Sequence, residues 1–323
     1  MHRLPVAIAV ALLWLPAPPA LAEGVRTVVD DLEREVRVPD RPERVVVTES
    51  QSLAVPLIEL GLLPVGSQGM MFEGTTPTLR GSAVTTGVDF DNADIEFIGF
   101  LDLDLEAIAA LEPDLILHSI EVEPYTGVDV DKLSPLAPVV ALESFSRPLG
   151  ELHARLADIT GADEDEARLR ARHEAQLAQL VRLADPASTS VSTFLPQDGG
   201  LYAEHTWGLL GEILREAGFA FPPIIDDIAP GGSAVFSAER LAELDADWVI
   251  LTYRSDAGEV PGDAVEAMED LLPSWCEALR ACREGRTVFL PRDEATTPSY
   301  AAASALMLSL VATLGDPLNR PDD

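Results

Sequence analysis

The sequence predicts an α/β protein of two lobes, each with a mostly parallel sheet covered by helices, joined by one long inter-lobe helix. Strand-like apolar runs alternate with helical patterns in both halves of the chain, which is typical of parallel sheets covered on both faces. The segment DLEAIAALEPDLIL at 104–117 is echoed by SAERLAELDADWVIL at 237–251. Residues 148–184, between the halves, carry no strand signal.

These patterns divide the 323 residues into a signal peptide (1–22), an N-terminal α/β lobe (23–147), linking helices (148–184) and a C-terminal α/β lobe (185–323). His2 and Arg3 precede a short apolar run, and the small residues that a signal peptidase needs follow it. No cysteine follows that run, so we expect a free periplasmic protein without a lipid anchor. No later stretch reaches about 18 uninterrupted apolar residues, and we expect a monomer that does not span a membrane.

In the first half, polar alternation, buried valines and helical spacing ended by glycine predict the elements in order. They are a hairpin (26–42), a strand (45–48), a helix from 52 to Gly61, a short apolar piece (63–65), a helix (104–111), a strand (114–118) and a helix-to-strand step (131–142). The second half repeats this plan. It predicts a strand (190–194), a helix (208–219), the echoed helix and strand (237–253), a helix through 271–283, a strand (287–291) and a final helix (298–314).

The linking region predicts two helices divided by Gly161. The second helix, about 163–183, would span roughly 30 Å and can act as a stiff strut between the lobes. Its apolar residues fall near one stripe: Leu169, Leu177, Leu180 and Val181. His173 lies on or beside that stripe, where a packed or surface histidine is expected and a metal ligand is not.

The echoed segments align in register, so that Glu106 matches Glu239 and Asp114 matches Asp247. Asp104 and Ser237 are suitable N-caps, which places both glutamates in a first helical turn. The helix dipole favours a carboxylate there by only about 0.3–1 kcal/mol. That effect explains an acid in either lobe, but not a matched acid in both.

The charge balance excludes one class of partner. The chain has 55 acidic and 22 basic residues and a formal net charge of -33, which repels phosphate backbones, so we expect no nucleic acid. The two cysteines, Cys276 and Cys282, predict a local disulfide in an oxidising compartment, with two unpaired thiols as the alternative. No histidine lies near them to complete a metal site.

Catalytic signatures are missing from the sequence. It has no G-x-S-x-G, H-E-x-x-H, Walker or dinucleotide motif. His118, His153, His173 and His205 are too scattered for a local zinc motif. We therefore expect a binding protein, not an enzyme, with neither a cofactor nor a bound metal of its own.

Five stretches in order resemble a known family: PERVVVTESQSLAVPLIELGLLPVGS, DLEAIAALEPDLILHS, KLSPLAPVVAL, FSAERLAELDADWVILTY and EGRTVFLPRDE. The chain resembles the periplasmic binding proteins of ABC importers for ferric siderophores, haem and cobalamin. This resemblance implies two lobes joined by one long helix and a ligand, here an iron-siderophore chelate, held between them. It also implies that Glu106 and Glu239 dock on the inner-membrane permease.

Ligands of parallel α/β lobes gather at the carboxyl ends of strands. The expected ligand contacts are residues after strands or in loops that reach the same edge: Glu49, Ser50, Arg80, His118, Tyr125, Tyr202, His205, Trp207, Tyr253, Arg254, Arg292 and Tyr300. Aromatic and arginine side chains suit a large, flat or anionic metal chelate. Hydroxamate-binding relatives tend to carry an arginine before the first echoed helix, whereas residues 99–106 hold no basic residue. Recognition of a strongly anionic chelate would then rest on Arg254, Arg292 or Arg80.

Three alternatives stay open at this stage. A relative in the same family would bind cobalamin or haem. A secreted α/β enzyme would show turnover without a permease. A scavenger of bare zinc or manganese would need converging ligands such as His118 and His205.

Overall fold

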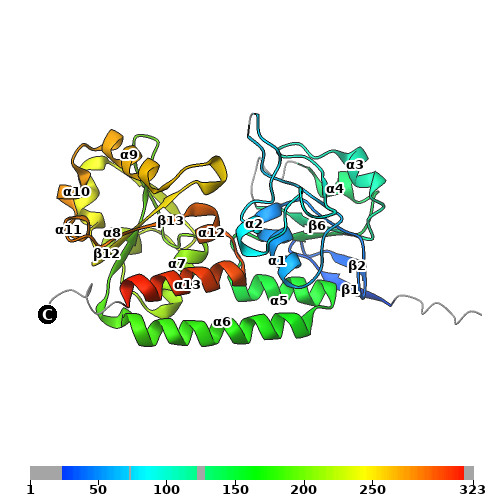
Figure 1. Cartoon of the computed structure of the whole chain (residues 1–323). Coiled ribbons are helices and arrows are strands. Elements are labelled where there is room, and N and C mark those ends of the chain that lie inside the picture. Colours follow the sequence, from blue (N-terminus) through cyan, green and yellow to red (C-terminus); the bar gives the residue numbers. More distant parts are fainter. Residues whose placement is uncertain (1–23, 73, 122–127, 316–323) are drawn as a thin grey trace, which may run out of the picture.

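The computed structural model describes residues 24–72, 74–121 and 128–315. Two lobes stand side by side on a layer of helices (Figure 1). The signal peptide predicted at 1–22 lies outside the described residues, as does Tyr125. Within the described residues, no helix is long and apolar enough to cross a membrane.

The N-terminal lobe is built on a five-stranded parallel sheet in the order β5-β4-β3-β6-β7. The strands are β3 Val45–Val47, β4 Gly66–Ser67, β5 Glu96–Phe97, β6 Leu115–Ser119 and β7 Val139–Leu142. Alternate residues of β6 enter opposite cores: Leu115 and Leu117 lie in one cluster, and Ile116 lies in another. Both faces of the sheet are therefore covered, as the alternating strand and helix patterns predicted.

Short helices connect these strands: α1 Val55–Glu59, α2 Ser82–Thr85, α3 Leu105–Ala110 and α4 Val130–Leu133. The helix expected from 52 begins earlier, as a π-helical turn (η1, Ser50–Ala54). The backbone N–H of Ser52 in this turn donates to the Glu49 side chain. The short apolar piece at 63–65 precedes β4: Leu63 is exposed, and Gly66 and Ser67 enter the sheet.

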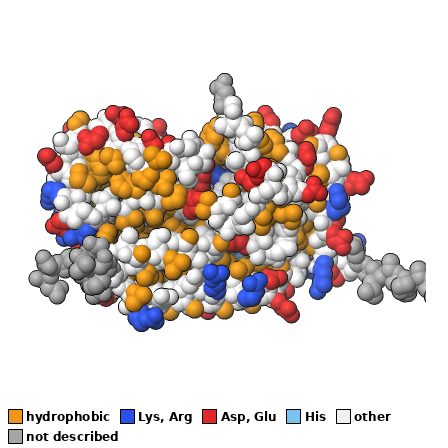
Figure 2. Space-filling model, in the orientation of Figure 1, with side chains coloured by type: hydrophobic (Ala, Val, Ile, Leu, Met, Phe, Trp, Pro, Cys, Tyr) orange, Lys and Arg blue, Asp and Glu red, His pale blue; other side chains and the backbone are white. Residues whose placement is uncertain are grey.

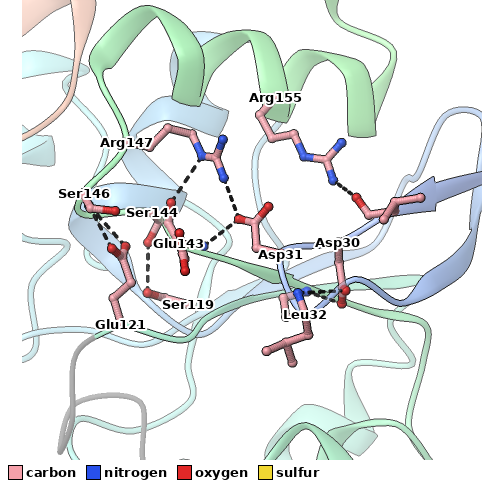
Figure 3. A network of polar contacts seen from close by, with 12 residues as sticks. Asp30, Asp31, Leu32, Ser119, Glu121, Glu143, Ser144, Ser146, Arg147 and Arg155 are labelled. Atoms are coloured by element: carbon pink, nitrogen blue, oxygen red, sulfur yellow. Dashed lines mark hydrogen bonds and ion pairs between the residues drawn. The ribbon is translucent and has the colours of Figure 1, made fainter.

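The predicted hairpin is present as β1 Val25–Val29 and β2 Glu35–Pro39, paired antiparallel. Asp31 holds it to the rest of the lobe, since its Oδ2 accepts bonds of 2.7 Å from Arg147 Nη2 and from the Glu143 backbone N–H. Arg155, on the helix α5 Leu149–Thr160 that follows Arg147, donates to the Val29 carbonyl (Figure 3).

The C-terminal lobe contains two sheets. The parallel sheet has the order β13-β12-β8, from β8 Val191–Thr193, β12 Trp248–Tyr253 and β13 Thr287–Pro291. The antiparallel sheet has the order β11-β10-β9, from β9 Leu195–Gln197, β10 Gly200–Glu204 and β11 Ser233–Phe236. The sequence analysis did not predict this second sheet.

Helices cover the parallel sheet of this lobe: α7 Gly208–Ala217, α8 Pro223–Asp226, α9 Pro261–Leu271, α10 Trp275–Ala278, α11 Arg280–Arg283 and α12 Arg292–Thr296, with short 3₁₀ turns η2 Pro186–Ser188, η3 Ala238–Leu244 and η4 Ser255–Ala257. The single helix expected through 271–283 is wrong. The chain breaks after α9, where Ser274 adopts a left-handed φ of 61°. A disulfide between Cys276 and Cys282, with Cα atoms 5.1 Å apart, links α10 to α11.

The helical layer consists of α5 Leu149–Thr160, α6 Asp163–Ala184 and α13 Tyr300–Leu314. Gly161 ends α5 with a left-handed φ of 76°, and α6 then runs for 22 residues beneath both lobes (Figure 1). The buried residues of α6 form one stripe: Glu166, His173, Leu180 and Ala184. Val181, expected near this stripe, is instead 42% exposed.

The echoed segments share one contact and differ in another. Asp114 accepts the backbone N–H groups of Glu43 and Arg44, just before β3, and Asp247 accepts the N–H of Ser190, just before β8. Each aspartate thus fastens its own strand to the neighbouring strand. Asp104 caps α3 through bonds of 3.0 Å. Ser237 makes no such cap, and the second copy is a 3₁₀ helix, contrary to the prediction.

Candidate functional site

Arginine side chains from both lobes converge where the lobes meet. Arg254 and Arg292 follow the carboxyl ends of β12 and β13, and Arg80 comes from the N-terminal lobe. Arg80 crosses the junction, because its Nε lies 2.6 Å from Asp293 Oδ1 on α12. We call these three side chains the arginine cluster.

Arg254 is held in two ways. Its Nη2 lies 2.8 Å from Asp256 Oδ2, and its guanidinium carbon lies 4.8 Å from the ring centroid of Phe72. Phe72 belongs to the N-terminal lobe, so this cation–π contact also crosses the junction. The hydrogen bond from Arg254 lowers the pKa of Asp256, although burial alone would raise it.

Arg292 is half-buried. Its Nε lies 3.2 Å from Thr252 Oγ1. Among the described residues, no carboxylate oxygen lies within 4.0 Å of the Arg292 guanidinium nitrogens. Burial lowers the pKa of Arg292. The negative charge of Glu259 opposes this shift, and the positive charges of Arg254 and Arg80 add to it. A cation crowded in this way is suited to an additional anion.

The N-terminal lobe contributes a buried polar chain at the carboxyl ends of its strands. Glu49 Oε2 accepts a bond of 2.7 Å from Ser52 Oγ, which lies 2.7 Å from Ser144 Oγ. Ser144 in turn donates to Ser119 Oγ at 2.9 Å (Figure 3). Burial raises the pKa of Glu49, although hydrogen bonds from Ser52 and the charge of Arg80 oppose that rise.

Two further N-terminal side chains grip the segment that follows the arginine cluster. Gln51 Nε2 donates to Thr296 Oγ1 at 2.9 Å and to Thr297 Oγ1 at 3.0 Å. Glu59 accepts bonds from Ser299 Oγ and from the backbone N–H groups of Tyr300 and Ala301. The segment 292–301 is therefore held by the opposite lobe along its length.

The structure places two predicted contacts away from this cluster. His118 is buried in β6, where Thr48 Oγ1 lies 2.9 Å from its Nδ1, and burial lowers its pKa to about 4. Tyr300 is 4% exposed and packs between His153 and His173 in the helical layer, with ring centroids 4.4 and 5.5 Å away. Both side chains are therefore buried in this structure, away from the arginine cluster.

The remaining aromatic candidates occupy the C-terminal lobe. Tyr202 donates to Glu204 Oε1 at 2.7 Å. Its ring packs edge-on against the Trp207 ring, with the two ring centroids 5.7 Å apart. His205 Nδ1 lies 3.1 Å from Thr206 Oγ1. Trp207 is buried with no hydrogen-bond partner for its indole N–H among the described residues. Tyr253 ends β12, one residue before Arg254, and is half-buried, whereas Ser50 is buried at the start of η1.

Glu106 and Glu239, predicted to dock on a permease, are both exposed. Acidic side chains are spread over the visible face of both lobes (Figure 2). Two open depressions of about 330 and 320 Å³ lie elsewhere on the molecule, one beside β2 and one beside η3. Neither is lined by the arginine cluster. Among the described residues, no three potential metal-ligating side chains converge.

Sequence reasoning missed the partners of the arginines, namely Asp256, Asp293 and Phe72. The available signal was adjacency: Asp293 directly follows Arg292, and Asp256 lies two residues after Arg254. In a chain with 55 acidic residues, that signal does not stand out.

Solved structures with this fold cover nearly the whole chain. FhuD from S. pseudintermedius aligns with a TM-score of 0.67 at 21% identity, over 90% of this chain and 98% of its own. Staphylococcus aureus SirA complexed with staphyloferrin B has a TM-score of 0.72 at 18% identity, over 90% and 98%. The petrobactin-binding protein YclQ from Bacillus subtilis has a TM-score of 0.70 at 18% identity, over 90% and 99%.

No curated protein matched the sequence. A family model described as Periplasmic binding protein matches residues 77–293, a span that begins just before Arg80 and ends at Asp293. This span covers most of the chain and includes the arginine cluster, and the chain therefore belongs to the periplasmic binding protein family.

Proposed function

We propose that this protein captures a ferric siderophore where its two lobes meet and delivers it to the permease of an ABC importer in the inner membrane. The observation that carries the proposal is the convergence of Arg80, Arg254 and Arg292 from opposite lobes. Guanidinium groups recognise the oxygen atoms of anionic chelates through charge-assisted hydrogen bonds. The similar structures named above include one with staphyloferrin B and one that binds petrobactin.

The role is binding and delivery, without catalysis, in the periplasm. Membership of the family supports this location and this role. Glu106 and Glu239 are the proposed contacts with the permease, since each is an exposed acid in the corresponding helix of its lobe. A monomer with one exposed glutamate on each lobe suits a permease made of two like subunits.

The ligand is tested by titrating the protein with ferric hydroxamates, ferric catecholates, ferric citrate, haem and cobalamin. Quenching of Trp207, Trp248 and Trp275 is the first readout, and calorimetry is the second because all three indoles are buried. Saturable submicromolar binding of one ferric class is expected. Saturation by haem or cobalamin alone would assign the ligand to the alternative class, and silence in both assays would overturn the proposal.

The docking role is tested separately in vesicles containing the permease. Glu106→Ala combined with Glu239→Ala should leave the dissociation constant of the chelate unchanged while uptake falls to background. Glu266→Ala, at an exposed position of α9, is the matched control. Uptake that equals the wild-type rate would contradict the docking role.

A further inference from the structure

The carboxylates of the arginine cluster are more deeply buried than its arginines. The Asp293 side chain is 4% exposed and that of Asp256 is 7% exposed, whereas Arg80 and Arg254 are 25% and 30% exposed. In the ion pair of Arg168 with Asp165, by contrast, both side chains are exposed, at 69% and 50%. The two aspartates thus lie beneath the guanidinium groups that line the junction.

The two aspartates also interact with each other. A hydrogen bond between their side chains lowers the pKa of Asp256 and contributes to the raised pKa of Asp293, for which burial is the largest cause. The pair is held on one side by Arg80 and on the other by Arg254.

An anionic ligand that reaches these arginines must compete with groups already bound to them. Arg80 Nε is taken by Asp293, and Arg254 donates through Nε and Nη2 to Asp256. Arg292 alone has no carboxylate partner among the described residues. The first anionic group of a ligand would pair with Arg292, and a second would have to replace a protein carboxylate.

Asp293 is the carboxylate whose replacement affects both lobes. It belongs to α12 of the C-terminal lobe, while Arg80 belongs to the N-terminal lobe. The Asp256–Arg254 pair lies within one lobe. Removing the Arg80–Asp293 contact would leave the Phe72–Arg254 contact and the Gln51 hydrogen bonds to hold this side of the junction.

We propose that Asp293 acts as a built-in competitor: in this structure it occupies the place of a ligand carboxylate on Arg80, and an anionic, carboxylate-bearing chelate binds by displacing it. This inference rests on the proposed function and adds the ligand class and the residue that sets its affinity. Asp293 is a specificity-determining residue, because only a ligand with its own negative charge gains from the exchange.

The test compares Asp293→Asn with the wild-type protein, using ferric citrate as the anionic probe and ferrioxamine B as a chelate without carboxylates. The variant should bind ferric citrate about tenfold more tightly, since Arg80 loses its competing charge, and its affinity for ferrioxamine B should stay within twofold. Asp226→Asn is the matched control: it removes a half-exposed carboxylate from an ion pair with Arg215. An unchanged or weaker affinity for ferric citrate, or an equal gain for both chelates, would overturn the inference.

Two further measurements keep the inference separate from the ferric function. Iron-free citrate is titrated by calorimetry into both proteins. We expect the Asp293→Asn variant to bind citrate more tightly than the wild-type protein does, even if no ferric chelate binds. No citrate binding by either protein would overturn the inference. Arg80→Gln should reduce ferric citrate affinity at least tenfold without altering ferrioxamine B binding, which provides a second variant if Asp293→Asn fails to fold.

Discussion

Each lobe supplies a glutamate that caps a helix held by the other lobe, and the pKa values of these two glutamates shift in opposite directions. Glu59 on α1 of the N-terminal lobe accepts bonds from the first turn of α13, which packs in the core of the C-terminal lobe. Glu212 on α7 of the C-terminal lobe accepts a bond of 2.8 Å from the Leu149 N–H at the start of α5. Each lobe therefore satisfies a helix terminus of the other.

The difference lies in what surrounds each carboxylate. Burial raises the pKa of Glu59, but hydrogen bonds from His153, Ala301 and Ser299 outweigh it, and the net shift is downward. Burial also raises the pKa of Glu212, to about 7. Only one hydrogen bond, from the Leu149 backbone, opposes this rise, and the charges of Glu216 and Glu151 add to it. A buried carboxylate is thus stabilised only where enough donors converge on it.

The largest effect is expected for Glu59→Ala. This change leaves His153, Ser299 and two backbone N–H groups without an acceptor. We expect the free energy of unfolding in urea at pH 7 to fall by about 3 kcal/mol or more, from an unsatisfied cost of about 1–3 kcal/mol per buried group. Glu266→Ala is the exposed control. A loss below about 1 kcal/mol for Glu59→Ala would show that the Glu59 hydrogen bonds do not hold the two lobes together.

A smaller effect with a clear pH signature is expected for Glu212→Gln. The folded pKa is raised from 4.5 to about 7, so the native state binds the extra proton between these values and wild-type stability falls as pH rises through that window. Glutamine keeps an acceptor for the Leu149 N–H. The variant should therefore be more stable than wild type by about 1–3 kcal/mol at pH 8 and nearly equal at pH 4.5. A difference that does not change with pH would refute the raised pKa.

Acidification sharpens the same comparison at Glu59. Its folded pKa is lowered, so the stability it contributes is present above its unfolded pKa and is lost as pH falls through the folded value. Below pH 4.5 the wild-type protein should lose stability faster than Glu59→Gln, which has no carboxylate to titrate. Parallel stability curves for the two proteins between pH 3 and pH 7 would contradict this assignment.

The smallest effect concerns the echoed helices. Asp104→Ala should cost about 1 kcal/mol, because Asp104 caps two backbone N–H groups of α3. Ser237→Ala should change the free energy of unfolding by less than about 0.5 kcal/mol, because Ser237 caps nothing in η3. Equal losses in urea unfolding would show that η3 forms a capped helix in solution.

The sequence predicted the strands β3, β6, β7 and β12, because their apolar residues are almost all buried. It did not predict the two-residue parallel strands β4 and β5. It did not predict β9, whose three residues Leu195, Pro196 and Gln197 show no strand pattern and pair with a neighbour across a tight turn. The partner on the other side of β10, β11, is separated from it in sequence by α7 and α8. Such pairing depends on tertiary contacts, which local patterns do not record.

The candidate site was predicted only in part, for a related reason. Residues after strand ends were identifiable, and Arg254 and Arg292 lie together at that edge. The same rule also selected His118, which lies within β6 and points into a bond with Thr48. Position at a strand end fixes where the backbone lies, but the direction of each side chain depends on its neighbours.

The grip of the N-terminal lobe on segment 292–301 has a consequence for chain integrity. The polypeptide passes between the lobes once, through α5 and α6, yet Arg80, Gln51 and Glu59 bind the opposite lobe without any covalent link. A protease cut at the turn between Gly161 and Ala162 would sever the chain but not these contacts. We expect the two fragments to migrate as one complex in gel filtration, held together like the halves of a split protein.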